Sequence, residues 1–135
     1  MFVLYHNENT LYVTGGIDQE LKHISKRAFI LNPEQAKCEP LPDMTQVRYA
    51  HFGTQFKNRL YIFGGRQFGK NEGAILKQCE YFDFDTWRWN MITPMIKRRC
   101  SGFVLDFMDD LYVFGGYSGN KNRCEIIEKY CVYEN

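Results

Sequence analysis

Short segments of the chain alternate between apolar and polar positions, and this two-residue period is typical of β-strands. In residues 48–56 the even positions from 50 to 56 lie on one face of the predicted strand and the odd positions on the other. A polar two-residue turn at Asn58-Arg59 leads into a second, more apolar strand at residues 60–63. Further strands are predicted at residues 78–84 and 87–92, both rich in aromatic side chains. No stretch combines a helical period with helix caps, so the sequence predicts an all-β domain.

A six-residue motif recurs three times along the chain. It reads LYVTGG at residues 11–16, LYIFGG at residues 60–65 and LYVFGG at residues 111–116, with spacings of 49 and 51 residues. The flanking positions also match: at a shift of 51, Arg48 aligns with Arg99 and Phe52 with Phe103. A unit of about 50 residues with four short antiparallel strands is typical of a β-propeller blade.

Each motif ends in a glycine pair. Glycine adopts a positive φ without strain and lets neighbouring backbone approach closely. We therefore expect Gly65 and Gly116 to be required by the backbone at the end of the second strand.

The order of these features resembles the kelch repeat. Its tyrosine-aspartate pair falls on Phe82-Asp83, its tryptophan on Trp89 and its methionine on Met95. In the preceding unit the tryptophan position holds Cys38, which suggests a looser blade. The resemblance covers essentially the whole chain and implies kelch-type β-propeller blades, each with four antiparallel strands.

The predicted domain organisation is one kelch propeller segment over residues 1–135, with blade units at approximately 1–44, 45–95 and 96–135. The third unit has strands at 99–107, 111–114 and 124–133 but lacks the fourth, which leaves an incomplete arc of about 2.75 blades. Propellers close with about four to eight blades. We therefore expect a fragment of a larger protein, with the remaining blades of a parent chain or other copies closing the ring. An open strand edge and uncovered aromatic faces predict that the isolated chain associates, aggregates or melts at low temperature.

Charge and composition narrow the classes of partner and the cell compartment. The net charge is +1 from 17 basic and 16 acidic residues, so no global field draws the chain to nucleic acid or to a membrane. The five cysteines form no recognisable framework, and no signal peptide precedes them, which favours a reducing, cytoplasmic compartment. Residues 95–130 resemble kelch proteins of ciliated unicellular eukaryotes, which favours the cytoskeleton or cilium.

Candidate catalytic and metal-binding residues do not assemble into a motif. The three histidines have no ligand spacing, and no C-x-x-C pair or nucleophile elbow is present. Cys100 follows two arginines that would activate an exposed thiol, but its strand position favours a buried small residue. The carboxylate pairs Asp109-Asp110 and Asp83/Asp85 are interpreted as turns. The sequence therefore predicts no enzyme, no metal and no cofactor.

The loops after the glycine pairs differ between units, at residues 17–26, 66–77 and 117–123. Kelch domains that recognise peptides or proteins bind through residues just after the glycine pair and near the start of the first strand. The resemblance therefore implies a binding face that contains Arg66, Ser101, Tyr117 and Ser118.

The function predicted from this resemblance is a protein–protein interaction module or scaffold of cytoskeletal or axonemal kind. One alternative is the substrate-recognition propeller of a cullin-type ubiquitin ligase adaptor. The other alternative, much less favoured, is an enzyme that uses a propeller.

Overall fold

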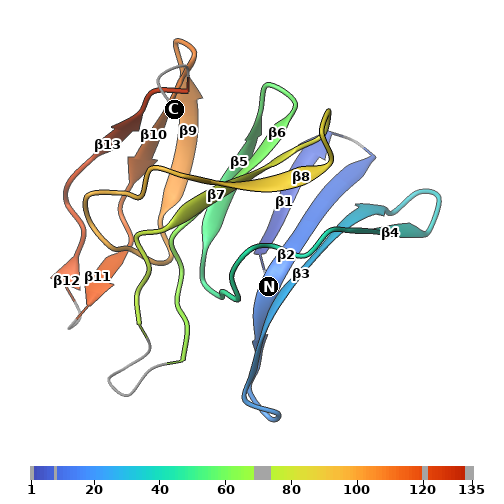
Figure 1. The fold of residues 1–135 in the computed structure, drawn as a ribbon, viewed down its shortest axis with the longest axis horizontal. Helices are drawn as coiled ribbons and strands as arrows, with labels where there is room; N and C mark the ends of the chain where they lie inside the picture. The colour runs from blue at the N-terminus through green and yellow to red at the C-terminus, as the bar shows by residue number, and fades with distance from the viewer. Residues whose placement is uncertain (1, 8, 69–73, 120–121, 133–135) are drawn as a thin grey trace.

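The computed structural model describes residues 2–7, 9–68, 74–119 and 122–132. Three antiparallel sheets lie side by side, and we call them blades 1, 2 and 3 in chain order (Figure 1). None of the described residues is helical. The prediction of an all-β, kelch-type arc is thus confirmed.

Blades 1 and 2 each contain four strands in sequential order, and blade 3 contains three among the described residues. Blade 1 consists of β1 (Phe2–Asn7), β2 (Thr10–Asp18), β3 (His23–Asn32) and β4 (Lys37–Leu41). Blade 2 consists of β5 (Phe52–Phe56), β6 (Arg59–Phe63), β7 (Cys79–Asp83) and β8 (Arg88–Ile92). Blade 3 consists of β9 (Phe103–Phe107), β10 (Asp110–Phe114) and β13 (Glu128–Tyr130), and a small ribbon pairs β11 (Tyr117–Gly119) with β12 (Asn122–Arg123).

Four predicted boundaries of strands and turns are wrong. The first strands begin at Phe52 and Phe103 rather than four residues earlier, because Ala50 and Ser101 have φ values of 50° and 53° and interrupt the extended chain. The turn predicted at Asn58-Arg59 lies one residue earlier, since residues 57 and 58 both have positive φ. The last predicted strand, residues 124–133, is ordered as a strand only at residues 128–130, and residue 133 lies outside the described residues.

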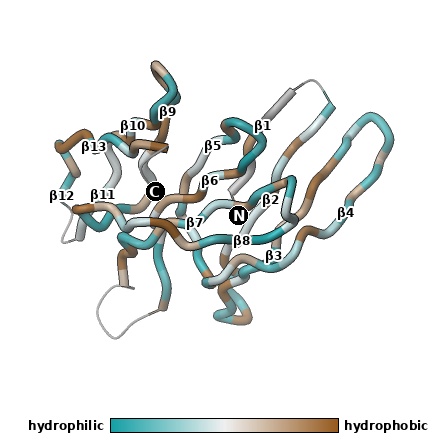
Figure 2. Tube along the Cα trace, turned by 45° about the horizontal axis from the view of Figure 1, so that its top comes forward, coloured by the Kyte–Doolittle hydropathy of each residue, from teal (hydrophilic) through white to brown (hydrophobic). Residues whose placement is uncertain are grey.

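Strand β6 is the centre of the arc because both of its faces are covered. Leu60 and Ile62 pack against blade 1, whereas Tyr61 and Phe63 pack against blade 3. All four side chains are at most 1% exposed. The strand is nearly continuously apolar, as expected for a sheet buried on both sides. Figure 2 shows apolar and polar positions alternating along the strands, with polar positions at the β3–β4 turn and along the outer strand β8.

The structure confirms the register of the predicted repeat. Phe82 pairs with Trp89 across β7 and β8, and Leu31 pairs with Cys38 across β3 and β4. The indole of Trp89 packs on the Phe82 ring at 5.3 Å, whereas Cys38 is exposed. The tryptophan position of blade 1 therefore lacks the aromatic contact that blade 2 has.

The glycine pairs adopt the predicted conformation. Gly65 and Gly116 have φ values of +100° and +84°. A Cβ atom would lie 2.8 Å from the Tyr49 carbonyl oxygen at Gly65 and 2.4 Å from the Cys100 carbonyl oxygen at Gly116. Both the backbone angle and the close approach thus require glycine.

A fully buried arginine joins the start of each later blade to the third strand of that blade. In blade 2, Arg48 Nη1 donates to the carbonyl oxygens of Gly64 and Gln78 at 2.7 and 3.1 Å, and its Nη2 donates to Glu80 at 2.8 Å. The other Glu80 oxygen accepts hydrogen bonds of 2.8 Å from the backbone N–H and the hydroxyl of Thr45.

Blade 3 has an equivalent arrangement around Arg99. Arg99 donates to the carbonyl oxygens of Gly115 and Ile126 and to the Glu128 carboxylate. In blade 1, Phe29 pairs with Val13 where Glu80 pairs with Ile62, so the described part of blade 1 lacks this acidic residue.

We predict that Glu80→Ala strongly destabilises the fold. The change leaves the buried Arg48 charge without its carboxylate, a loss that costs about 3–5 kcal/mol. The matched control is Asp43→Ala, which removes a half-exposed ion pair with Lys26 and should cost at most about 1 kcal/mol. Urea unfolding of both variants measures the difference, and equal losses would contradict the prediction.

We also predict that His51 makes the folded state less stable at acid pH. This side chain is 4% exposed and contacts the Thr14 hydroxyl through Nε2 at 2.8 Å. Burial, together with the Arg48 charge, lowers the pKa of His51 from 6.5 to about 3. The unfolded chain therefore binds the proton more readily, so stability is complete above pH 6.5 and falls as the pH drops toward 3.

Between pH 7 and pH 5.5 the free energy of unfolding should fall by about 1.3 kcal/mol through this group. Urea unfolding at several pH values gives the slope, which His51→Gln should flatten and His23→Gln, at an exposed position, should leave unchanged. A slope that persists in His51→Gln would assign the effect to other groups.

Candidate binding surface

In blades 2 and 3, backbone hydrogen bonds hold the residue after the glycine pair against the start of the same blade. Tyr49 N donates to Arg66 O at 3.1 Å, and Arg66 N donates to Tyr49 O at 2.8 Å. Cys100 and Tyr117 exchange the same two hydrogen bonds at 3.0 and 2.9 Å. Arg66 and Tyr117 therefore occupy equivalent places in blades 2 and 3.

Two further hydrogen bonds bring these places next to each other. Gly65 N donates to Arg99 O at 3.0 Å, and Ser101 N donates to Ala50 O at 2.7 Å. Arg66 consequently lies beside the first residues of blade 3, close enough for its charge to act on the Cys100 thiol. The structure thus brings Arg66, Ser101 and Tyr117 to one end of the blades.

Figure 1 shows the β2–β3 turn, the segment after β6 and the β11–β12 ribbon at the same end of the three sheets. Ser118 lies in the middle of β11, half-buried next to Tyr117. The predicted loop at residues 117–123 is therefore partly a strand ribbon, in which Tyr117 pairs with Arg123. Residues 69–73 of the predicted loop after β6 lie outside the described residues.

A depression of about 430 Å³ opens at this end of blade 3. Ser101, Tyr117, Arg123 and Glu125 line it together with the glycine pair. Tyr117 is 44% exposed, and Ser101 and Arg123 are also exposed. The depression thus combines an aromatic ring, a hydroxyl and charges of both signs.

Two aromatic residues extend this surface and were missed by the sequence analysis. The rings of Tyr49 and Phe68 lie 6.4 Å apart, and Phe68 is 52% exposed. Gln67 fixes the segment by donating from its side chain to Val47 O at 2.9 Å. The sequence gives one indication of this pair, which is that both aromatic residues lie close to predicted features. Tyr49 directly precedes Ala50, and Phe68 follows Arg66 by two positions. We define the loop surface as Tyr49, Arg66, Phe68, Ser101, Tyr117, Ser118 and Arg123.

The thiol and the carboxylates considered as candidate catalytic groups lie in the core or at the ends of strands. Burial raises the pKa of the candidate thiol Cys100, which is 2% exposed. Burial also raises the pKa of Cys79, a core cysteine that was not a candidate, to about 11. Asp83 ends β7 and accepts hydrogen bonds from the backbone of Asp85 and Thr86 in the turn that follows. The turn predicted at Asp109-Asp110 lies one residue earlier, because Asp109 has a φ of 64° whereas Asp110 begins β10. Within the described ranges, no three acidic, histidine or cysteine side chains gather as metal ligands would, and no helix is long and apolar enough to cross a membrane.

Comparison with known proteins agrees with this architecture. The Kelch motif model matches residues 7–45 and 48–96. Kelch-like protein 25 of Xenopus tropicalis is 30% identical, in an alignment that covers 93% of this chain and 22% of that protein. Kelch-like protein 41a of Danio rerio is 30% identical over 90% of this chain and 19% of its own length.

A third similar protein is Kelch domain-containing protein 2 of Bos taurus, 28% identical over 65% of this chain and 22% of its own length. The chain thus spans about a fifth of the length of these relatives. The repeated motif, the blade architecture and the matched residues agree, and the chain belongs to the kelch-repeat family.

Proposed function

We propose that this chain is the interaction module of a larger kelch propeller protein and binds a segment of a partner protein at the loop surface. The observation that carries the proposal is the contrast between framework and loops. Blades 2 and 3 share the same buried arginine and the same backbone hydrogen bonds, yet the equivalent places hold Arg66 in one and Tyr117 in the other. A constant framework with different exposed side chains suits recognition of a specific partner.

The chemistry of the loop surface favours an extended segment with carboxylates and an apolar side chain. Arg66 and Arg123 supply positive charge, while Phe68 and Tyr117 supply exposed rings. Arginine and tyrosine are enriched among residues that dominate binding energy, since both combine large contact area with directional hydrogen bonds. Glu125 places one negative charge at the rim, so the partner carboxylates would lie on the Arg66 side.

The cellular setting that fits this module is the cytoplasm, in a scaffold of cytoskeletal or axonemal kind. This part of the proposal rests on the balanced charge, the odd number of cysteines and the resemblance carried by residues 95–130. Fluorescent tagging of the full-length protein tests it, because a scaffold should decorate filaments or the axoneme.

We predict that Arg66→Ala and Tyr117→Ala each weaken peptide binding about tenfold with little loss of stability. Peptides selected from a displayed random library against the chain serve as the probe, and the selected sequences should be enriched in Asp or Glu. Binding is measured by calorimetry and stability by urea unfolding, where each variant should lose less than about 1 kcal/mol.

The matched control is Arg88→Ala, at an exposed position on the outer strand β8. Its peptide affinity should equal that of the unchanged chain. Equal weakening by all three variants, or losses of stability that match the losses of affinity, would show that the loop surface is not the binding site.

A further inference from the structure

The turn between β7 and β8 holds a large aromatic side chain at the end of blade 2 that lies opposite the loop surface (Figure 1). Trp87 is 49% exposed, and its ring centroid lies 5.3 Å from that of Phe82 and 6.3 Å from that of Phe84. Both contacts are edge-to-face, a geometry that aromatic pairs favour. Backbone hydrogen bonds fix the turn, since Trp87 N donates to Asp83 O at 2.8 Å and Phe84 N donates to Asn58 O at 3.2 Å. The indole is therefore held in place while the residue stays half-exposed.

The backbone of this turn does not require an aromatic residue. Trp87 has a φ of 60°, in the left-handed region that glycine and asparagine adopt readily and that strains a bulky side chain. The equivalent turn of blade 1 holds Ala36 at the same place, 51 positions earlier, with a φ of 49°. A small side chain thus makes the same turn. Residues held in strained conformations concentrate at binding and active sites, so Trp87 is a candidate for a role in recognition.

The same turn carries a carboxylate without a cationic partner. Asp85 is exposed and accepts a hydrogen bond of 2.8 Å from the Asn58 side-chain amide. No lysine or arginine within the described ranges forms an ion pair with it. The cations of the adjacent β5–β6 turn are already paired with other carboxylates, Lys57 with Asp109 at 2.8 Å and Arg59 with Asp83 at 3.3 Å. Asp85 therefore presents its negative charge to water two residues before Trp87.

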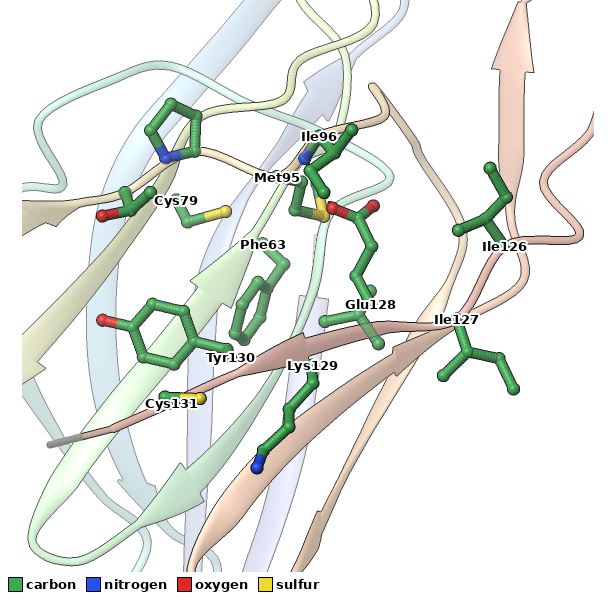
Figure 3. A pocket seen from close by; sticks show the side chains of 13 residues that line it. Phe63, Cys79, Met95, Ile96, Ile126, Ile127, Glu128, Lys129, Tyr130 and Cys131 are labelled. Atoms are coloured by element: carbon green, nitrogen blue, oxygen red, sulfur yellow. Dashed lines mark hydrogen bonds between the residues drawn. The ribbon is translucent and has the colours of Figure 1, made fainter. Parts of the chain in front are cut away.

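The cavity of about 400 Å³ beside β13 offers different chemistry. Figure 3 shows its carboxylate, that of Glu128, directed toward Ile96. This group accepts hydrogen bonds from the backbone N–H groups of Ile96 and Lys97 and from the Arg99 side chain. The charge of Glu128 is thus used within the blade, whereas the charge of Asp85 is left for a partner.

We infer that Trp87 and Asp85 bind an exposed arginine side chain of a partner protein, whose guanidinium stacks on the indole and pairs with the carboxylate. The site goes beyond the binding of an acidic segment at the loop surface, because it lies at the opposite end of blade 2 and carries the opposite charge. The module thus contacts a second, basic segment.

Arginine suits this pair of side chains better than lysine does. Its guanidinium is planar and weakly hydrated, so one face stacks on an aromatic ring while the N–H groups at its edge donate to a carboxylate. Tryptophan is the aromatic side chain that attracts a cation most strongly. The ammonium group of lysine is compact and strongly hydrated, so it gains less from the ring.

The probe is the peptide acetyl-Gly-Gly-Arg-Gly-Gly-amide, titrated into the nitrogen-15-labelled chain and followed by NMR. The signals of residues 84–88 and of the Trp87 indole N–H should shift in a saturable way, whereas the Trp89 indole N–H, which donates to Pro42 O, should not shift. The same peptide with citrulline, which has the shape of arginine without its charge, should bind at least about fivefold more weakly. No saturable shift, shifts confined to other residues, or equal affinity for the citrulline peptide would overturn the inference.

Three variants of the chain test the two side chains separately. Trp87→Asn removes the indole with a residue that accepts the positive φ, and it should weaken arginine binding about fivefold. Asp85→Asn should weaken it about threefold, whereas Asp106→Asn, which removes an exposed carboxylate from β9, should leave it unchanged. Equal effects of Asp85→Asn and Asp106→Asn would show that only the overall charge matters, and the site would be wrong.

Tyr117→Ala distinguishes this site from the loop surface, where Tyr117 is exposed and lines the same depression as Glu125. The variant should bind the arginine peptide with unchanged affinity. If Tyr117→Ala weakens binding and Trp87→Asn does not, the arginine binds at the loop surface and the assignment is wrong. Urea unfolding of each variant completes the test, because a loss of stability without a loss of binding in Trp87→Asn would show that Trp87 serves only in packing.

Discussion

The buried arginine–glutamate pair is the interaction on which the rest of each later blade depends. The side chains of Arg48 and Glu80 are both 0% exposed, so neither charge keeps its hydration. Such burial is tolerated only where partners satisfy the charged atoms. Arg48 bonds to Glu80 and two carbonyl oxygens, while Thr45 bonds to the second carboxylate oxygen. Burial lowers the pKa of Arg48, and the charge of Glu80 opposes that change.

The backbone of the same arginine reaches the preceding blade. Arg48 O accepts a hydrogen bond from Gly16 N, and Arg99 O accepts one from Gly65 N. Each arginine therefore holds its own blade with its side chain and the previous blade with its carbonyl group. The residue after the glycine pair is placed by this joint, which explains why Arg66 and Tyr117 occupy equivalent positions although their side chains differ.

The sequence predicts those parts of the structure in which blades 2 and 3 match at a constant spacing of 51 residues. The glycine pairs, the strand register through Trp89 and, to within one residue, the turns at the carboxylate pairs follow from local patterns. A comparison at a shift of 51 residues does not align Glu80 with Glu128. The loop after the glycine pair is three residues shorter in blade 3 than in blade 2, so the third strands of the two blades match at a shift of 48.

The first residues of β5 and β9 could not be predicted from the sequence for a different reason. The alternation of side chains continues through Ala50 and Ser101, but the hydrogen bonds between blades hold these residues at positive φ. The grouping of Arg66, Ser101 and Tyr117 follows from the family resemblance. The contact of Tyr49 with Phe68 depends on how two segments fold back on each other, and no periodic pattern encodes it.

The exposed face of blade 3 has the composition of an interior surface. Blade 3 covers three phenylalanines of blade 2: Phe52, Phe56 and Phe63. The equivalent residues of blade 3, at a shift of 51, are Phe103, Phe107 and Phe114. In blade 3, Phe103 is 54% and Phe107 60% exposed. A repeat that ends an array in water carries a polar outer face. Aromatic side chains at these positions instead match the contact that blade 2 makes with its neighbour. The face of blade 3 therefore has the chemistry of a surface that another polypeptide segment covers.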